Sequence, residues 1–140
     1  MKIKFTHEIS LRVRYSETDQ MGYCYYGNYA QYYEVGRVET LRKLGISYKE
    51  LEADNVMLPV SELNVRYKHP AKYDDLLRIR TTIREMTGAR LMFDYTVVNE
   101  LDKVISEGST TLVFVSKETM KPIQPPDNFT ALVKQHELAD

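Results

Sequence analysis

Apolar and polar residues alternate in five stretches of this chain, a pattern typical of strands with one buried face. The first stretch runs from His7 to Tyr15. The other four follow from residue 61 onward and are separated by short breaks at residues 70–75, 87–88 and 100–103. They cover residues 61–68, 77–84, 91–97 and a last stretch that ends at 112–115. Short connections between consecutive strands predict a largely antiparallel sheet.

A long helix is predicted between the first strand and the other four. Residues 28–44 contain no proline, their apolar positions recur at helical intervals, and Gly45 stands where a C-terminal cap is expected. Gly36 lowers the helix propensity, and a close approach of the helix to the sheet would explain it. Residues 47–53 are expected to form a second, short helix, and the tail from about residue 122 is weakly helical.

Composition and charge fit a single globular domain over residues 1–140. The chain is 43% hydrophobic and 28% charged, and it has a net charge of −1, which argues against nucleic-acid binding. It has neither an apolar run long enough to cross a membrane nor the apolar region of a secretory signal. One cysteine, Cys24, cannot form an internal disulfide, so we expect a cytoplasmic protein.

The segment DQMGYCYYG at residues 19–27 carries the strongest chemical signal. Asp19 lies in a loop in which Gly22 and Gly27 permit unusual backbone angles, and the long helix starts immediately afterwards. A helix start offers backbone N–H groups that lack a partner within the helix. A carboxyl group beside such donors can activate a nucleophile, or attack itself, while the donors stabilise an oxyanion.

This segment, with its flanks, resembles the acyl-CoA thioesterase branch of the hotdog fold, which includes 4-hydroxybenzoyl-CoA thioesterase and thioesterases associated with the Tol–Pal gene cluster. The resemblance lies in YxxxDxxGxxxYGNY at residues 15–29 and EVGRxE at residues 34–39. It implies an α+β hotdog fold, with a curved, largely antiparallel five-stranded sheet around a long central helix. The implied activity is hydrolysis of acyl-CoA thioesters.

The resemblance also implies roles for individual residues. Asp19 matches the catalytic acid, which acts as nucleophile or general base. Tyr26 matches the position whose backbone N–H polarises the thioester carbonyl. This chain has tyrosine where some relatives have histidine, and Arg90 is the one basic residue left of a cluster that binds coenzyme A phosphates in some relatives. The predicted substrate-binding residues are Gly22, Tyr25, Gly27, Asn28, Tyr29 and Arg90.

Partners follow from the same resemblance. We expect a homodimer or homotetramer with active sites at the subunit interface, and coenzyme A or acyl carrier protein as the carrier of the acyl group. No cofactor is expected, because coenzyme A is part of the substrate. No metal site is predicted, since His7, His69 and His136 are scattered along the chain. Two other functions stay open: acyl-thioester binding without catalysis, and an acyl-thioester dehydratase or hydratase, which the absence of a histidine near the helix disfavours.

Several residues have simpler interpretations. Cys24 is expected to be a packed, inert thiol, and His69 to be structural. Glu34, Arg37 and Glu39 fit substrate positioning, but an ion pair between Glu34 and Arg37 on the helix surface is favoured. The tyrosines around the segment fit an acyl pocket as well as a core or a dimer contact. A solvated sheet face is favoured over phosphate binding for the basic residues on alternating strand positions, which are Arg66, Lys68, Arg78, Arg80 and Arg84.

Overall fold

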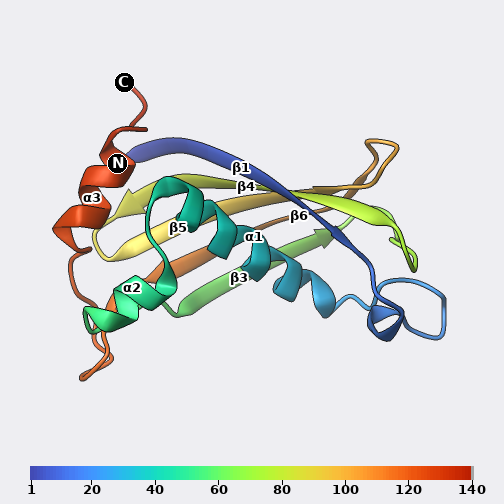
Figure 1. The fold of residues 1–140 in the computed structure, drawn as a ribbon, viewed down its shortest axis with the longest axis horizontal. Helices are drawn as coiled ribbons and strands as arrows, with labels where there is room; N and C mark the ends of the chain where they lie inside the picture. The colour runs from blue at the N-terminus through green and yellow to red at the C-terminus, as the bar shows by residue number, and fades with distance from the viewer. Residues whose placement is uncertain (140) are drawn as a thin grey trace.

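The computed structural model describes residues 1–139 and consists of one five-stranded antiparallel sheet with a long helix lying across one face (Figure 1). The strands lie in the order β1-β4-β5-β6-β3, and β2 and β7 pair separately. The strands are β1 (Lys2–Arg12), β2 (Val56–Met57), β3 (Val60–Tyr67), β4 (Leu76–Thr87), β5 (Arg90–Val98), β6 (Val104–Val113) and β7 (Val115–Ser116). The helices are α1 (Asn28–Leu44), α2 (Tyr48–Ala53) and α3 (Asp127–Lys134).

The predicted α+β architecture is confirmed, and α1 has the predicted bounds. Gly45 ends α1 with a φ of 126° and donates its N–H to the carbonyl of Leu41. The first strand differs from its prediction of residues 7–15. It begins at Lys2 and ends at Arg12, because the chain leaves the ladder at Val13, whose N–H bonds the carbonyl of Asp75. A turn of 3-10 helix, Tyr15–Glu17, follows.

Close packing between α1 and the sheet holds the helix in place. A Cβ atom at Gly36 would lie 2.5 Å from the Thr81 hydroxyl oxygen and 2.9 Å from a methyl carbon of Ile79, so the predicted close approach is confirmed. One turn earlier, the ring of Tyr33 stacks on that of Tyr95 with their centroids 4.3 Å apart. These contacts fix where the start of α1 lies relative to the strands.

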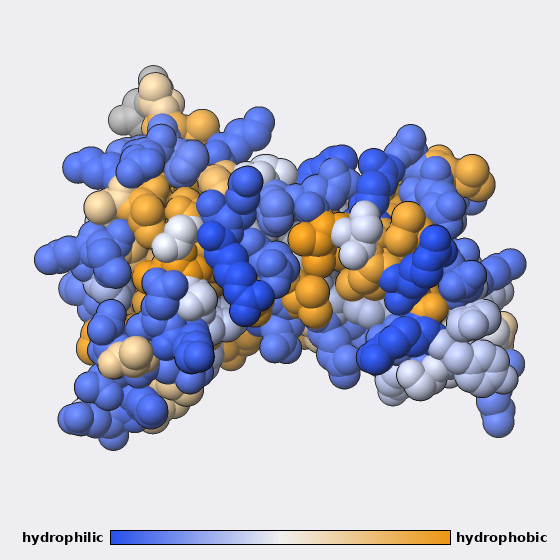
Figure 2. All heavy atoms as spheres, in the orientation of Figure 1, coloured by the Kyte–Doolittle hydropathy of each residue, from blue (hydrophilic) through white to orange (hydrophobic). Residues whose placement is uncertain are grey.

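The two edges of the sheet are covered differently. The segment after α3 runs beside the start of β1, where Lys4 donates to the carbonyl of His136 and Leu138 donates to that of Lys2. On β3, at the other edge, Val60, Leu63 and Tyr67 are each about half-exposed. On the face that carries α1, apolar surface is divided into separate groups by hydrophilic side chains (Figure 2). Within residues 1–139 we find no helix with the length and hydropathy of a membrane span.

Candidate active site

A tight loop presents Asp19. The N–H of Asp19 donates to the carbonyl of Tyr23 (2.8 Å), and the N–H of Gly22 donates back to the carbonyl of Asp19 (3.0 Å). Gly22 has a φ of 81°, a left-handed conformation that glycine adopts without strain. Gly22 therefore acts as the turn residue that its motif position predicts.

The side chain of Asp19 is half-buried and is oriented by the same loop. Its Oδ1 accepts hydrogen bonds from the N–H of Met21 (2.9 Å) and the N–H of Tyr23 (3.3 Å). Among the residues described, none donates a hydrogen bond to Oδ2. One carboxyl oxygen is thus held by the backbone, and the other is free to contact a ligand.

The start of α1 provides the candidate donors. The N–H groups of Tyr25, Asn28 and Tyr29 donate to the carbonyls of Glu17, Tyr25 and Tyr26, respectively. In contrast, the N–H groups of Tyr26 and Gly27 have no acceptor within residues 1–139. The Asn28 amide donates to the Glu17 carbonyl (2.8 Å) and so fastens the helix start to the preceding turn.

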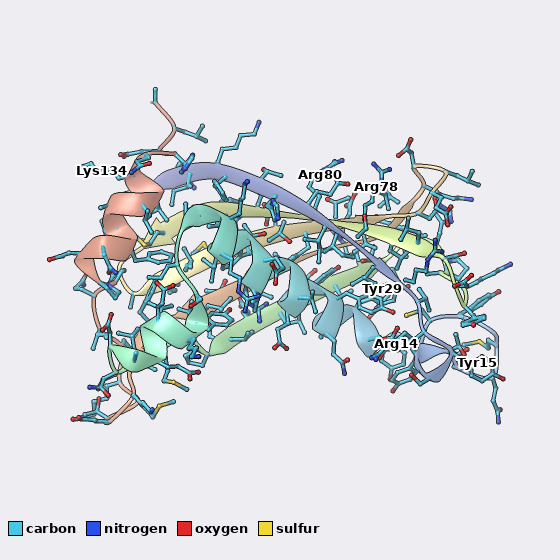
Figure 3. All side chains as sticks on the ribbon, viewed as in Figure 1. Arg14, Tyr15, Tyr29, Arg78, Arg80 and Lys134 are labelled. Atoms are coloured by element: carbon cyan, nitrogen blue, oxygen red, sulfur yellow. The ribbon has the colours of Figure 1, made fainter. Side chains whose placement is uncertain are left out.

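These elements meet around an open cavity of about 280 Å³. Asp19, Tyr26 and Tyr29, predicted from the sequence, all line it. Tyr29 lies in the first turn of α1, close to the loop that carries Arg14 and Tyr15 (Figure 3). The end of β3 and the segment after it form the opposite wall, which sequence reasoning did not assign to the site; its lining residues are Tyr67, Lys68, His69 and Pro70.

Glu17 was not predicted from the sequence as a site residue. Its side chain stabilises the turn that leads into the Asp19 loop. The residue is 8% exposed, and its carboxylate accepts hydrogen bonds from the Arg14 N–H (2.8 Å) and the Tyr32 hydroxyl (2.9 Å). Burial by itself would raise the pKa of Glu17, but these bonds and the Arg14 guanidinium together lower it below its ordinary value of 4.5. The only feature of the sequence that pointed to Glu17 as part of the site was its position two residues before Asp19.

Because the folded-state pKa of Glu17 is lowered, its contribution to stability is present above about pH 4.5 and is lost as the pH falls through the folded-state value. We expect Glu17→Gln to destabilise the fold at pH 7 by about 1.5–3 kcal/mol, the range for hydrogen bonds to charged groups. The difference from wild type should shrink toward acid pH. Urea unfolding between pH 7 and pH 3 measures this, with the exposed Glu118→Gln as control; a difference that is constant with pH would contradict it.

Arg90 lies far from this cavity within one subunit. It pairs with Val113 on β6, whereas Tyr67, at the cavity, pairs with Ser106 on the same strand. Seven residues of strand correspond to about 23 Å. Within one subunit the structure therefore does not bring Arg90 together with the other predicted site residues.

The predicted ion pair between Glu34 and Arg37 is wrong. Arg37 is buried and donates to the hydroxyls of Tyr48 and Tyr95, and within the described residues the ion pair on α1 joins Glu39 and Arg42. Most of the strand arginines have carboxylate partners on neighbouring strands or in the turn between β5 and β6, which supports the solvated-face interpretation. The pairs are Arg66–Glu107, Arg78–Glu8, Arg78–Asp102 and Arg84–Asp94. Arg78 and Arg80 lie on β4, an inner strand of the sheet, away from Tyr15 (Figure 3).

The tyrosines divide between the core and the site. Tyr32 and Tyr33 are buried, Tyr25 and Tyr26 are exposed, and Tyr29 is buried but also lines the cavity. Cys24 is buried beside Tyr32, with its sulfur 3.4 Å from that hydroxyl. Burial raises the pKa of the Cys24 thiol, which favours the inert form predicted from the sequence.

Comparisons with known sequences cover most of the chain. The family model for the thioesterase-like superfamily matches residues 13–133. The acyl-CoA thioester hydrolase YbgC of Escherichia coli O6:H1 is 36% identical over 125 residues, which are 89% of this chain and 93% of that protein. The acyl-CoA thioesterase YbgC of Haemophilus influenzae is 30% identical over 122 residues, covering 86% and 89% of the two chains.

Solved structures show the same fold. The DHNA-CoA thioesterase of Staphylococcus aureus superimposes with a TM-score of 0.89 at 32% identity and covers 93% of this chain and 89% of its own. A 4-hydroxybenzoyl-CoA thioesterase in complex with 4-hydroxybenzoyl-CoA superimposes with a TM-score of 0.84 at 18% identity, a likeness of fold alone, and covers 92% and 99%. The hotdog fold predicted from the sequence is confirmed.

Proposed function

The chain belongs to the thioesterase-like superfamily, and from this premise we propose that it hydrolyses acyl-CoA thioesters to free acid and coenzyme A at the Asp19 cavity. The observation that carries the proposal is that Asp19, with a free carboxyl oxygen, and Tyr26, with an unbonded N–H group just before α1, line one cavity. The names of the relatives support the substrate class. The proposed reaction uses no metal or cofactor.

In the proposed mechanism, the thioester carbonyl oxygen accepts a hydrogen bond from the N–H of Tyr26. Charge that develops on this oxygen is then stabilised by a donor already in place. Asp19 either removes a proton from an attacking water or attacks the carbonyl carbon itself and forms a mixed anhydride, which water cleaves. In both routes the sulfur leaves as thiolate, which is a good leaving group. A single turnover in isotope-labelled water separates the two, because label in the Asp19 carboxyl arises only through the anhydride.

Thiol release from a panel of short, long and aromatic acyl-CoAs tests the proposal. We expect turnover of at least one member, and the preferred member names the acyl group. A dehydratase or hydratase would change the acyl chain without releasing thiol, and a binding protein would show saturable binding without turnover. Either result would replace the proposed activity. The same panel attached to acyl carrier protein identifies the carrier.

We also propose that the protein is a homodimer joined through β3, with antiparallel pairing of the two copies of this strand. Two observations support this. The β3 edge leaves backbone groups and half-exposed apolar side chains uncovered, a condition that soluble proteins normally avoid. The Asp19 cavity opens beside the end of β3, so a partner on this edge would help to close it.

The dimer predicts a mass twice the 16.4 kDa of the chain in sedimentation equilibrium. Leu63 lies near the middle of β3, so a two-fold axis would bring both copies of this residue together. We expect Leu63→Lys to produce monomers by like-charge repulsion and to reduce turnover. Leu101→Lys, in a loop and 85% exposed, is the matched control and should stay dimeric. A monomeric wild type would refute this assembly.

A further inference from the structure

Arg37 is a buried cation without an anionic partner. It lies on the sheet-facing side of α1, and 7% of its surface is exposed. Its Nε donates to the Tyr48 hydroxyl (2.8 Å), and its Nη1 donates to the Tyr95 hydroxyl (3.1 Å). A guanidinium has five N–H groups, so most of its donor capacity is left over. No carboxylate within residues 1–139 lies within ion-pair distance of it.

The two tyrosines do not neutralise this charge. Burial raises the pKa of Tyr48 and of Tyr95, so both phenols are neutral near pH 7 and accept the hydrogen bonds from Arg37 without carrying a charge. A buried charge is normally paired, because leaving water is costly unless an opposite charge compensates. The described residues therefore leave Arg37 without a carboxylate in direct contact, so an external anion could supply the counter-charge.

A cavity is present where that counter-charge would lie. Arg37 lines a cavity of about 180 Å³ between α1, α2 and the segment that leads into β3. The other walls are mainly apolar, and the lining includes Tyr48, Leu51, Val56, Met57, Leu58 and Met120. The cavity shares no lining residue with the Asp19 cavity. Arg37 is nine residues beyond Asn28, about 14 Å along the helix.

We propose that the Arg37 cavity binds a carboxylate attached to a short apolar body. The carboxylate accepts charge-assisted hydrogen bonds from the free guanidinium N–H groups, and the apolar body packs on the leucine and methionine side chains. The volume is below the roughly 300 Å³ at which pockets for drug-sized ligands begin, so the ligand is a small organic acid. Glu52, exposed on the cavity wall, opposes a second negative charge and favours a monocarboxylate.

Calorimetric titration of the full-length protein with pentanoate or benzoate tests the site, with the corresponding primary amides as neutral ligands of equal shape. We expect a dissociation constant between about 0.05 and 5 mM for the acids, from the binding energy per atom typical of small ligands. The amides should bind at least about tenfold more weakly. Equal affinity for acid and amide, or no detectable binding of either acid, would overturn the proposal.

Substitutions at Arg37 and in the cavity wall test whether the acids bind in this cavity. Arg37→Gln should abolish acid binding, whereas Arg42→Gln, the same charge change on the exposed surface of α1, should leave it unchanged. Leu58→Trp fills the cavity while keeping Arg37, so it should block binding even if Arg37→Gln fails to fold. Glu52→Gln should tighten binding by removing the opposing charge. Acid binding that persists in Leu58→Trp would place the ligand elsewhere and overturn the proposal.

The carboxylate has two conceivable sources, a free acid or the far end of an acyl chain on a thioester; the second rests on the proposed function. Arg37 lies about 14 Å along the helix from Asn28, so only a long acyl chain could carry a carboxylate from the Asp19 cavity to it. Comparison of hexadecanedioyl-CoA with hexadecanoyl-CoA therefore separates the two sources. A KM for hexadecanedioyl-CoA alone that rises at least about tenfold in Leu58→Trp identifies the substrate source. Equal KM values in both proteins, with pentanoate binding intact in wild type, identify a free acid. The titrations require no turnover, so failure of the hydrolase proposal and failure of this one are distinguishable.

Discussion

Asp19→Asn is expected to lower kcat for acyl-CoA hydrolysis by about 10²-fold or more. The amide keeps an oxygen that can accept from the N–H groups of Met21 and Tyr23, so the loop should survive the substitution. What is lost is the basic and nucleophilic carboxyl oxygen, which both proposed routes require. KM should change little, because the shape of the cavity is preserved.

Asp75→Asn is the matched control for Asp19→Asn. Asp75 also lies in a loop and also accepts a backbone hydrogen bond, from the N–H of Lys72 (2.9 Å), but it does not line the cavity. Thiol release by the wild type and both variants, on the same substrates, should show a loss in Asp19→Asn alone. Equal turnover by all three proteins would remove Asp19 from the chemistry.

The second prediction with a large expected loss of activity concerns the backbone N–H of Tyr26. Replacing the amide of this residue by an ester, through incorporation of the α-hydroxy acid of tyrosine, removes the N–H and keeps the side chain. We expect kcat to fall by about 10²–10³-fold, the loss typical for removal of one oxyanion donor. Tyr26→Phe keeps the N–H and removes only an exposed hydroxyl, so it should retain nearly full kcat.

An ester at Tyr29 controls for loosening of the helix start. It removes the weak hydrogen bond (3.3 Å) from the N–H of Tyr29, the second residue of α1, to the Tyr26 carbonyl. This variant should lose far less activity than the ester at residue 26. If both esters lose activity equally, the effect is one of helix stability, and the N–H of Tyr26 has no special role.

The sequence predicted the long helix and the four long strands that follow it well because their signals are local. Residues 28–44 contain no proline and end at a glycine with the required positive φ. The first strand was misplaced although Ile3 and Phe5 alternate with polar neighbours, as strand residues do. Its real end at Arg12 depends on a bond between Val13 and Asp75, a contact between distant segments that periodicity does not reveal.

Only the part of the candidate site that lies within one local motif could be predicted from the sequence. Asp19, Tyr26 and Tyr29 lie within one motif, so the sequence places them together. Lys68 and His69 reach the cavity through the pairing of β3 with β6, which no local pattern encodes. The spacing of residues along α1 does indicate that Arg37 is buried, since it is four residues from both Tyr33 and Leu41, which lie on the buried face of the helix. Arg37 was nevertheless expected on the helix surface, because charged residues are rarely fully buried.

The contact at Gly36 has a consequence for engineering a more heat-resistant variant. Exchanging a mid-helix glycine for alanine is a standard stabilising change, because alanine is the better helix former by about 1 kcal/mol. At this position the added methyl group would overlap Thr81 and Ile79, and it would push α1 away from the sheet. A helix-strengthening library should therefore keep residue 36 constant and vary the solvent-facing positions of α1, such as Gln31, Glu34 and Val35.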